Sequence, residues 1–388
     1  MKWGVRKLLV ACVLSISPGA MAATVLDSSL RLTAEERYDD DFRLGETEPG
    51  VDEGASGQFM TKLTPRLGLE LKDPRTTGEA FYATDLLMRH GSGKVTLDHR
   101  AGMQLRHVLS RRMRLDFTGR LFRVTDPTSL PREGLARSLA PIIYGQARLS
   151  ATGRVTQRLD VSARYAFEGA KVFEDGREPG FVHTPSVEAW YRSTRRLTLG
   201  IEYRYQGFVF GNGYSDGHGA FAGLRYRLTR QTTFTARGGP VLYTSPEGQS
   251  ELLPRIALEL AREGELFDIG VTVGHDLVGA SGFTNALWAD YASLMFARRI
   301  NQRWSVYGAG SFFRNGRAPS DGAFSLKDTA YVSQGYAVGG GVEFRMNRHL
   351  TLQGAVDRIA QVGAGSEEAA GVDLARNVLA VRLVVSAW

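Results

Sequence analysis

The stretch Leu197–Tyr205 reads LTLGIEYRY, and its large apolar residues occupy every second position. Leucine, isoleucine and tyrosine share one parity, while Glu202 and Arg204 lie on the other. Successive side chains of a β-strand point to opposite faces, whereas a helix repeats every three to four residues. This spacing therefore predicts a strand with one apolar face and one charged face.

The same alternation recurs along most of the chain. It is clearest at 63–71, 95–105, 159–167, 220–228, 252–260 and 267–273. None of these segments fits helical spacing. After residue 22 no apolar run approaches the roughly 18 residues that a membrane-spanning helix needs. The sequence predicts an all-β protein.

Two kinds of connection alternate between the predicted strands. The short kind is a degenerate repeat of the type STRRL, and it occurs at 109–113, 155–159, 193–197, 228–232, 300–304 and 346–350. The long kind is rich in Gly, Pro, Asp and Ser, and it occurs at 39–58, 126–141, 169–182, 207–217, 315–328 and 362–373. Short turns on one side and long loops on the other are typical of bacterial membrane barrels. We predict a closed antiparallel transmembrane β-barrel of about eighteen strands, with short periplasmic turns and longer extracellular loops.

A soluble propeller or solenoid is the alternative, because both show period-two strands and repeats of similar length. The distribution of side chains argues against it. Soluble barrels place their apolar residues inside, whereas here the predicted outward faces are apolar and the opposite faces carry Arg, Asp, Glu and Gln. The chain also stops within a predicted strand, 378–388, that ends on Trp388.

The first 22 residues predict a secretory signal peptide. Lys2, Arg6 and Lys7 precede the apolar stretch 8–16, and the small-residue triplet 20–22 is typical of a cleavage site. A lipoprotein signal at Cys12 is the alternative, but too few apolar residues precede that cysteine. Cleavage removes the only cysteine and lowers the formal charge from +7 to +4. We therefore expect residues 23–388 to form a single barrel domain in the outer membrane of a Gram-negative bacterium, without disulfides or thiolate metal sites.

The inward faces of the predicted strands carry more arginines than acids. Rings of Arg select for anions, because a guanidinium is always charged and binds carboxylate or phosphate through paired hydrogen bonds. Bracing of the wall by ion pairs with acids such as Asp85, Asp116, Glu188, Glu202, Asp276 and Asp290 is the alternative role. The arginines predicted to line an anion pathway are Arg100, Arg106, Arg114, Arg120, Arg148, Arg164, Arg192, Arg204, Arg225, Arg237 and Arg255.

Other kinds of site receive little support. The acidic loop 39–53 lacks the D-x-D-x-D-G spacing of a calcium loop, so we expect no metal there. The seven histidines are scattered, and no G-x-S-x-G, H-E-x-x-H or phosphate-loop motif occurs. We predict neither an enzyme nor a cofactor, and no nucleic-acid partner.

The terminal strand 378–388 resembles that of outer-membrane barrels, whose last strand ends on an aromatic residue that the barrel-assembly machinery recognises. Trp388 lies on the opposite parity from Leu379, Val381, Leu383 and Val385, unlike the usual signal. The resemblance implies contact with outer-membrane lipid and lipopolysaccharide as well as with the assembly machinery.

Strand number, the lack of a plug segment and the Arg-rich lumen resemble the barrels that export acidic exopolysaccharide, such as the alginate exporter. That resemblance implies an outer-membrane channel that receives an acidic polysaccharide from a periplasmic export protein and passes it to the cell surface. A general or anion-selective diffusion porin is the alternative, and an outer-membrane enzyme or adhesin is a third class. The inward aromatic residues expected to contact sugar are Phe81, Phe122, Tyr307 and Phe313.

Overall fold

The computed structural model describes residues 25–40, 57–91, 93–125, 141–173, 178–211, 213–279, 286–317, 331–363 and 374–387. These residues form eighteen strands. Their bounds are β1 Val25–Asp39, β2 Gln58–Lys72, β3 Thr76–Arg89, β4 Val95–Ser110, β5 Met113–Val124, β6 Ile142–Arg154, β7 Leu159–Val172, β8 Gly180–Arg192, β9 Leu197–Phe210, β10 Gly213–Arg227, β11 Thr232–Thr244, β12 Ser250–Arg262, β13 Phe267–Gly279, β14 Ala286–Arg299, β15 Trp304–Arg317, β16 Tyr331–Arg345, β17 Leu350–Gly363 and β18 Leu374–Ala387.

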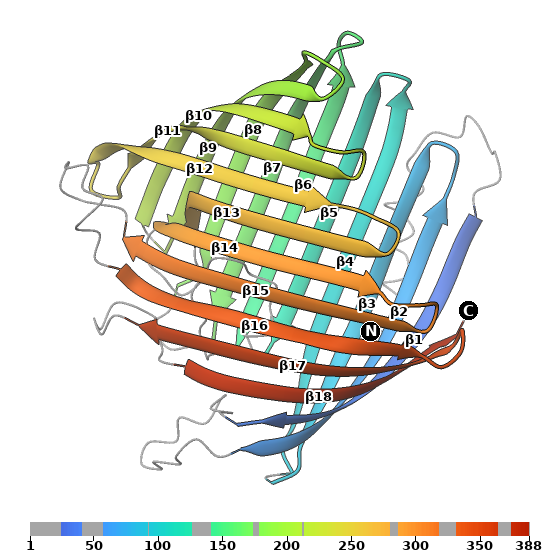
Figure 1. Ribbon diagram of the computed structural model, residues 1–388. Coiled ribbons are helices and arrows are strands. Elements are labelled where there is room, and N and C mark those ends of the chain that lie inside the picture. The colour runs from blue at the N-terminus through green and yellow to red at the C-terminus, as the bar shows by residue number, and fades with distance from the viewer. Residues whose placement is uncertain are drawn as a thin grey trace, which may run out of the picture.

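Each strand pairs antiparallel with the next one along the chain, and β1 pairs with both β2 and β18. Leu30 lies opposite Ala387 and Asp39 opposite Val378, so the first and last strands close the sheet along most of their length. Figure 1 shows the resulting up-and-down barrel, with the blue and red strands meeting at the closure. The predicted fold class and strand number are confirmed.

Ion pairs reinforce this closure on its inward face. Arg376 of β18 donates two hydrogen bonds to Asp39 of β1, at 2.8 and 2.9 Å, and both side chains are buried. Six residues further along β18, Arg382 binds Glu35 at 2.5 Å. These ion pairs add to the backbone hydrogen bonds that hold the first and last strands together.

The predicted long loop at 207–217 is wrong. β9 continues to Phe210 and β10 begins at Gly213, so two residues connect them, with Gly211 at a φ of +54° that favours glycine. Alternation fails as a signal here because Phe208 and Phe210 make the inward face of β9 apolar as well. A strand that is apolar on both faces does not show the period-two pattern.

The outer face of the barrel is apolar and exposed. Leu67 on β2, Leu121 on β5, Ile201 on β9 and Val381 on β18 are among more than fifty large hydrophobic residues that remain accessible. The inward faces carry the charged residues, so the barrel has the polarity of a membrane protein. The described residues contain no helix long and apolar enough to cross a membrane. The closed sheet and its apolar outer face make the protein a transmembrane β-barrel of the outer membrane.

Polar aromatic pairs interrupt this apolar surface at one height. The outward-facing pairs Tyr82–His99, Tyr165–His183 and Tyr203–His218 form hydrogen bonds of 2.6–2.8 Å between adjacent strands. Such residues are typical of the interfacial girdle of a barrel. Asp290 belongs to the same outer surface, where it binds His275 at 2.6 Å. The prediction that Asp290 faces the lumen is therefore wrong, because its strand is offset by one residue from the assumed register.

Three predictions fall on residues outside those the structure describes. They are the signal peptide 1–22, most of the acidic loop 39–53 and the terminal Trp388. β18 itself reaches Ala387 and pairs with β17 and β1.

Candidate functional site: the lumen wall

The two ends of the lumen differ in what lines them. On the side of the short turns, inward-facing charged residues are exposed: Arg31, Glu70, Lys72, Arg106, Arg114, Arg154, Arg192 and Arg227. On the opposite side the inward residues are buried: Asp39, Met60, Arg89, Val124, Ile142, Val172, Phe208, Tyr243, Asn315 and Ser333. In a bacterial barrel the short turns face the periplasm. The lumen is thus open and charged at its periplasmic end and packed at its extracellular end.

All eleven predicted arginines lie on inward-facing positions of β4–β12, but they fall into two groups. Seven contact a carboxylate, and four do not. The seven are Arg100, Arg106, Arg114, Arg164, Arg204, Arg237 and Arg255. We call the other four, Arg120, Arg148, Arg192 and Arg225, the open arginines.

The open arginines are all exposed to the lumen. Within the described parts of the chain, no carboxylate lies within ion-pair distance of any of them. Arg148 instead has Arg164 of the next strand as its charged neighbour. Arg225 lies over the ring of Trp190, with 4.8 Å between its guanidinium carbon and the ring centroid. These guanidiniums keep their N–H donors available to a passing anion.

A cavity of about 330 Å³ hollows the inner wall over β2–β5. Lys62, Arg100 and Arg120 supply positive charge at its surface, and Phe81 and Phe122 supply aromatic faces. Gly102 makes this hollow possible, because a Cβ at that position would overlap the ring of Phe81. The structure therefore brings two of the four predicted aromatic contacts beside two of the predicted arginines. Tyr307 and Phe313 lie on β15, in a different part of the wall.

Charge balance in this cavity is set by Asp85. Its carboxylate binds Arg100 at 2.6 Å and Lys62 at 3.4 Å, and it accepts a hydrogen bond from Thr64. Arg120 has no such partner among the residues described. Glu79 also lines the cavity, so three basic and two acidic side chains leave a net charge of +1 next to aromatic rings, an arrangement that suits an organic anion.

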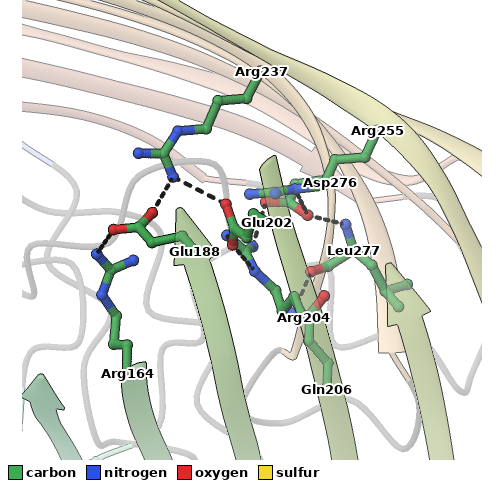
Figure 2. A network of polar contacts seen from close by, with 9 residues as sticks. All are labelled: Arg164, Glu188, Glu202, Arg204, Gln206, Arg237, Arg255, Asp276 and Leu277. Carbon is green, nitrogen blue, oxygen red and sulfur yellow. Dashed lines mark hydrogen bonds and ion pairs between the residues drawn. The ribbon is translucent and has the colours of Figure 1, made fainter. Parts of the chain in front are cut away.

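The wall from β7 to β13 carries a continuous chain of ion pairs, which Figure 2 shows. The chain alternates basic and acidic residues. Its members, which we call the braced network, are Arg164, Glu188, Arg237, Glu202, Arg204, Asp276 and Arg255, with successive separations of 2.9, 3.7, 3.1, 2.6, 3.8 and 2.6 Å.

Aromatic rings pack against two arginines of the braced network. Arg237 lies over Trp190 at 5.1 Å, and Arg255 lies over Phe221 at 4.6 Å. Glu188, Glu202 and Arg255 are buried. Buried charges of this kind are neutralised by one another and lie out of reach of a solute. The sequence alternative of structural bracing is thus correct for this part of the wall.

The short turns at the periplasmic mouth carry a further cluster of positive charge. Seven of the eight short turns contain an exposed arginine: Arg75, Arg111, Arg112, Arg158, Arg195, Arg196, Arg230, Arg303 and Arg348. The eighth turn, at residues 263–266, contains Glu263 and Glu265 instead. The degenerate turn repeat already contained this signal, since its charged position is almost always arginine. We call these residues the periplasmic rim.

The described residues contain no group of three or more His, Asp, Glu or Cys that could hold a metal ion. The histidines that are hydrogen-bonded to tyrosine lie on the outer surface, away from the lumen. The inner wall itself offers charge and shape.

No family model matches this sequence, and no curated protein sequence matches it. Solved outer-membrane barrels are similar in outline. Pseudomonas aeruginosa OpdL has 12% identity and a TM-score of 0.44, and the match covers 94% of this chain and 99% of that one. The outer membrane protein opdK from Pseudomonas aeruginosa has 11% identity and a TM-score of 0.45, covering 93% and 99%.

Acinetobacter baumannii OccAB1 has 10% identity and a TM-score of 0.42, covering 93% of this chain and 96% of that one. Likeness at this level assigns neither a solute nor a binding residue to this chain. Its function has to be argued from its own lumen.

Proposed function

We propose that this barrel is an outer-membrane channel that passes small organic anions across an arginine-lined wall. The open arginines carry the proposal. They are exposed, inward-facing and without a carboxylate partner among the described residues, and one of them borders the cavity over β2–β5. Weak and repeated guanidinium contacts lower the barrier for an anion without holding it.

The packed extracellular end supports a small solute over a wide one. An eighteen-stranded cylinder is wide enough for an aqueous channel. Here inward side chains of β9–β12 and residues of β13 and β14 form a buried apolar cluster around Phe208, Phe221 and Tyr243 near that end. A second cluster around Phe122 and Ile142 lies on β5–β7. Both reduce the open cross-section at the height where a solute leaves or enters.

Planar-bilayer recording of the purified barrel tests this proposal. In a tenfold KCl gradient we expect a reversal potential whose sign reports preference for chloride, and a further shift when chloride is replaced by benzoate, since a carboxylate and an aromatic ring both suit the cavity. Cation preference, or the absence of any conductance, would contradict the proposed function.

Secretion of an acidic polysaccharide is the second candidate, and the periplasmic rim is the observation that favours it. Positive charge at seven turns continues into the lumen through Arg154, Arg192 and Arg227. A linear polyanion can follow such a path from the periplasm, whereas a folded acidic protein reaches only the rim. The charges concentrate where an exported chain would first meet the barrel.

Deletion of the gene separates the two candidates. Loss of extracellular acidic polymer, with restoration by the intact gene, would support secretion. Unchanged polymer together with slower uptake of small carboxylates would support the diffusion channel. A periplasmic export partner and contact with lipopolysaccharide remain proposals, which co-purification with a tagged barrel from the complemented strain tests.

A further inference from the structure

The seam between β12 and β13 is only half paired. The ladder runs from Arg262 opposite Ile269 to Ile256 opposite His275, and there it stops. β12 continues for six residues to Ser250, and β13 continues for four to Gly279. Both strands remain paired along these segments with their other neighbours, β11 and β14. The barrel therefore contains two free strand edges in its extracellular half.

The free end of β13 lies inside the wall instead of beside β12. A Cβ at Gly279 would overlap the side chain of Val182 on β8 and would lie 3.3 Å from the ring of Phe208 on β9. Gln206 of β9 donates a hydrogen bond of 3.2 Å to the backbone oxygen of Leu277. The sheet therefore overlaps itself. The end of β13 lies on the lumen side of β8–β12, against their inward-facing side chains.

The parity of the side chains shows the same overlap. Leu277 and Trp288 lie on the outward side of β13 and β14, in line with the exposed Val273, yet they are 1% and 4% exposed. They pack against residues from the inward side of β9–β12. These residues, which together with Leu277, Trp288 and Ala286 we call the overlap cluster, are Phe208, Phe221, Val241, Tyr243 and Leu253.

A second arrangement of this seam is available without any change of register. Continuing the ladder would place Arg255 opposite Asp276, Pro254 opposite Leu277 and Leu253 opposite Val278. Arg255 and Asp276 are already joined at 2.6 Å, so this ion pair suits both arrangements. Leu277 and Trp288 would then face lipid, where apolar residues are equally stable. Pro254 weakens the paired form, since proline lacks the N–H that a ladder uses.

We infer that the end of β13 is a gate with two positions, overlapped as in the structure or paired with β12. In the overlapped position β13 lies against β8, so the extracellular half of the lumen is enclosed by β1–β8 and β13–β18. In the paired position all eighteen strands enclose it. Barrel diameter grows roughly linearly with strand number, so pairing raises the cross-section about 1.7-fold. This inference deepens the proposed channel function and rests on it: the gate sets the size of solute that passes.

A cavity of about 720 Å³ lies along the free edge of β12, lined by Ser250–Ile256 together with Gly239 and Pro240. It gives β12 room to receive a neighbouring strand at its edge. Backbone groups left unpaired within a membrane are costly, so the free edges favour a partner. The apolar contacts of the overlap cluster oppose that preference. Two opposing terms of this kind are what a two-position element requires.

Cysteine pairs test the gate, because Cys12 is the only cysteine of the chain and lies in the predicted signal peptide. Val182→Cys with Gly279→Cys joins residues that meet only in the overlapped position. Leu253→Cys with Val278→Cys joins residues that meet only in the paired position. Thr244→Cys with Ser250→Cys is the matched control, because these residues face each other within the β11–β12 hairpin in both positions.

We expect all three pairs to oxidise in the full-length barrel in liposomes, as shown by gel mobility with and without reductant. The Leu253/Val278 disulfide should raise single-channel conductance about 1.7-fold relative to the Val182/Gly279 disulfide, and reductant should remove the difference. Should the Val182/Gly279 variant fail to fold, Leu277→Cys supplies a second readout, since its labelling by a membrane-soluble maleimide requires exposure to lipid.

Failure of the Leu253/Val278 pair to form, while the control pair forms and Leu277→Cys stays unlabelled, would overturn the gate. Equal conductance of the two disulfide-locked forms would overturn its role in solute size. Disulfide formation reports on the gate alone, whereas ion selectivity reports on the proposed function. A barrel with two captured positions and no anion preference would therefore retain the gate and refute the anion channel.

Discussion

Arg120 on β5 and Arg148 on β6 face the same lumen as Arg204 on β9 and Arg255 on β12, yet their surroundings differ. The first two are exposed and have no carboxylate partner among the described residues. Arg204 binds Glu202 and Asp276, Arg255 binds Asp276, and both lie over Phe221. The first pair can bind a solute, and the second pair holds the wall together. The number of arginines in a lumen therefore says less about its function than the number left without acids.

The same contrast holds along the barrel axis. The periplasmic half is open and lined with exposed charge, and the extracellular half is packed with apolar clusters and buried ion pairs. A solute that enters from the periplasm therefore meets accessible guanidiniums first and a narrow section afterwards. The overlap of β13 beneath β8–β12 accounts for part of that narrowing.

Breaking the braced network is expected to have the largest effect. Glu202→Gln removes the carboxylate that lies between Arg204 and Arg237 and leaves two guanidiniums without it in a buried setting. Removing one partner of a buried pair costs about 3–5 kcal/mol. Urea unfolding of the barrel in liposomes, followed by tryptophan fluorescence, measures the change. Arg120→Gln is the control, and an equal loss of stability in both variants would contradict the division into braced and open arginines.

Converting an open arginine into a paired one sharpens the comparison. Ala166 lies directly opposite Arg148 on the inward face of β7. Ala166→Glu places a carboxylate within reach of that guanidinium, so we expect the preference for anions to fall about threefold with little change in stability, in keeping with the modest value of exposed pairs. Ala166→Gln supplies the neutral control. Selectivity that is unchanged by the glutamate would show that Arg148 takes no part in it.

Raising the salt concentration is expected to have the smallest effect. The Debye length falls from about 10 Å at 0.1 M to about 3 Å at 1 M, so exposed guanidiniums are screened before buried pairs are. We expect anion preference to decline over this range while the unfolding midpoint stays nearly constant. A midpoint that falls as steeply as the selectivity would mean that the braced network is also open to solvent.

Much of the fold could be predicted from the sequence because lipid and lumen impose opposite chemistry on alternate residues. Segments such as 197–205 and 95–105 show that contrast directly. The β9–β10 connection was mispredicted because Phe208 and Phe210 pack in the overlap cluster, so neither face of β9 is polar at its extracellular end. Asp290 was wrongly predicted to face the lumen. The side of the sheet on which it lies depends on the register of β14, and its partner His275 lies on another strand.

The division of the arginines could not be predicted. Arg237 on β11 meets Glu188 on β8 across two intervening strands, and Arg255 meets Asp276 only where the β12–β13 ladder ends. Such contacts depend on the curvature of the closed sheet, which alternation does not encode. The aromatic cavity was partly predictable, since Phe81 and Phe122 were placed inward correctly. The resemblance to polysaccharide exporters, the signal peptide and the role of Trp388 stay predictions.

The central claim is that open arginines, and not total lumen charge, make the channel select anions. Two double variants that each remove two positive charges test it most directly: Arg120→Gln with Arg148→Gln, and Arg100→Gln with Arg106→Gln. In the second variant Asp85 retains Lys62 and Asp116 retains Arg114. The reversal potential in a tenfold KCl gradient should fall by about half in the first variant, which keeps Arg192 and Arg225, and change little in the second. Equal shifts in both would contradict the account.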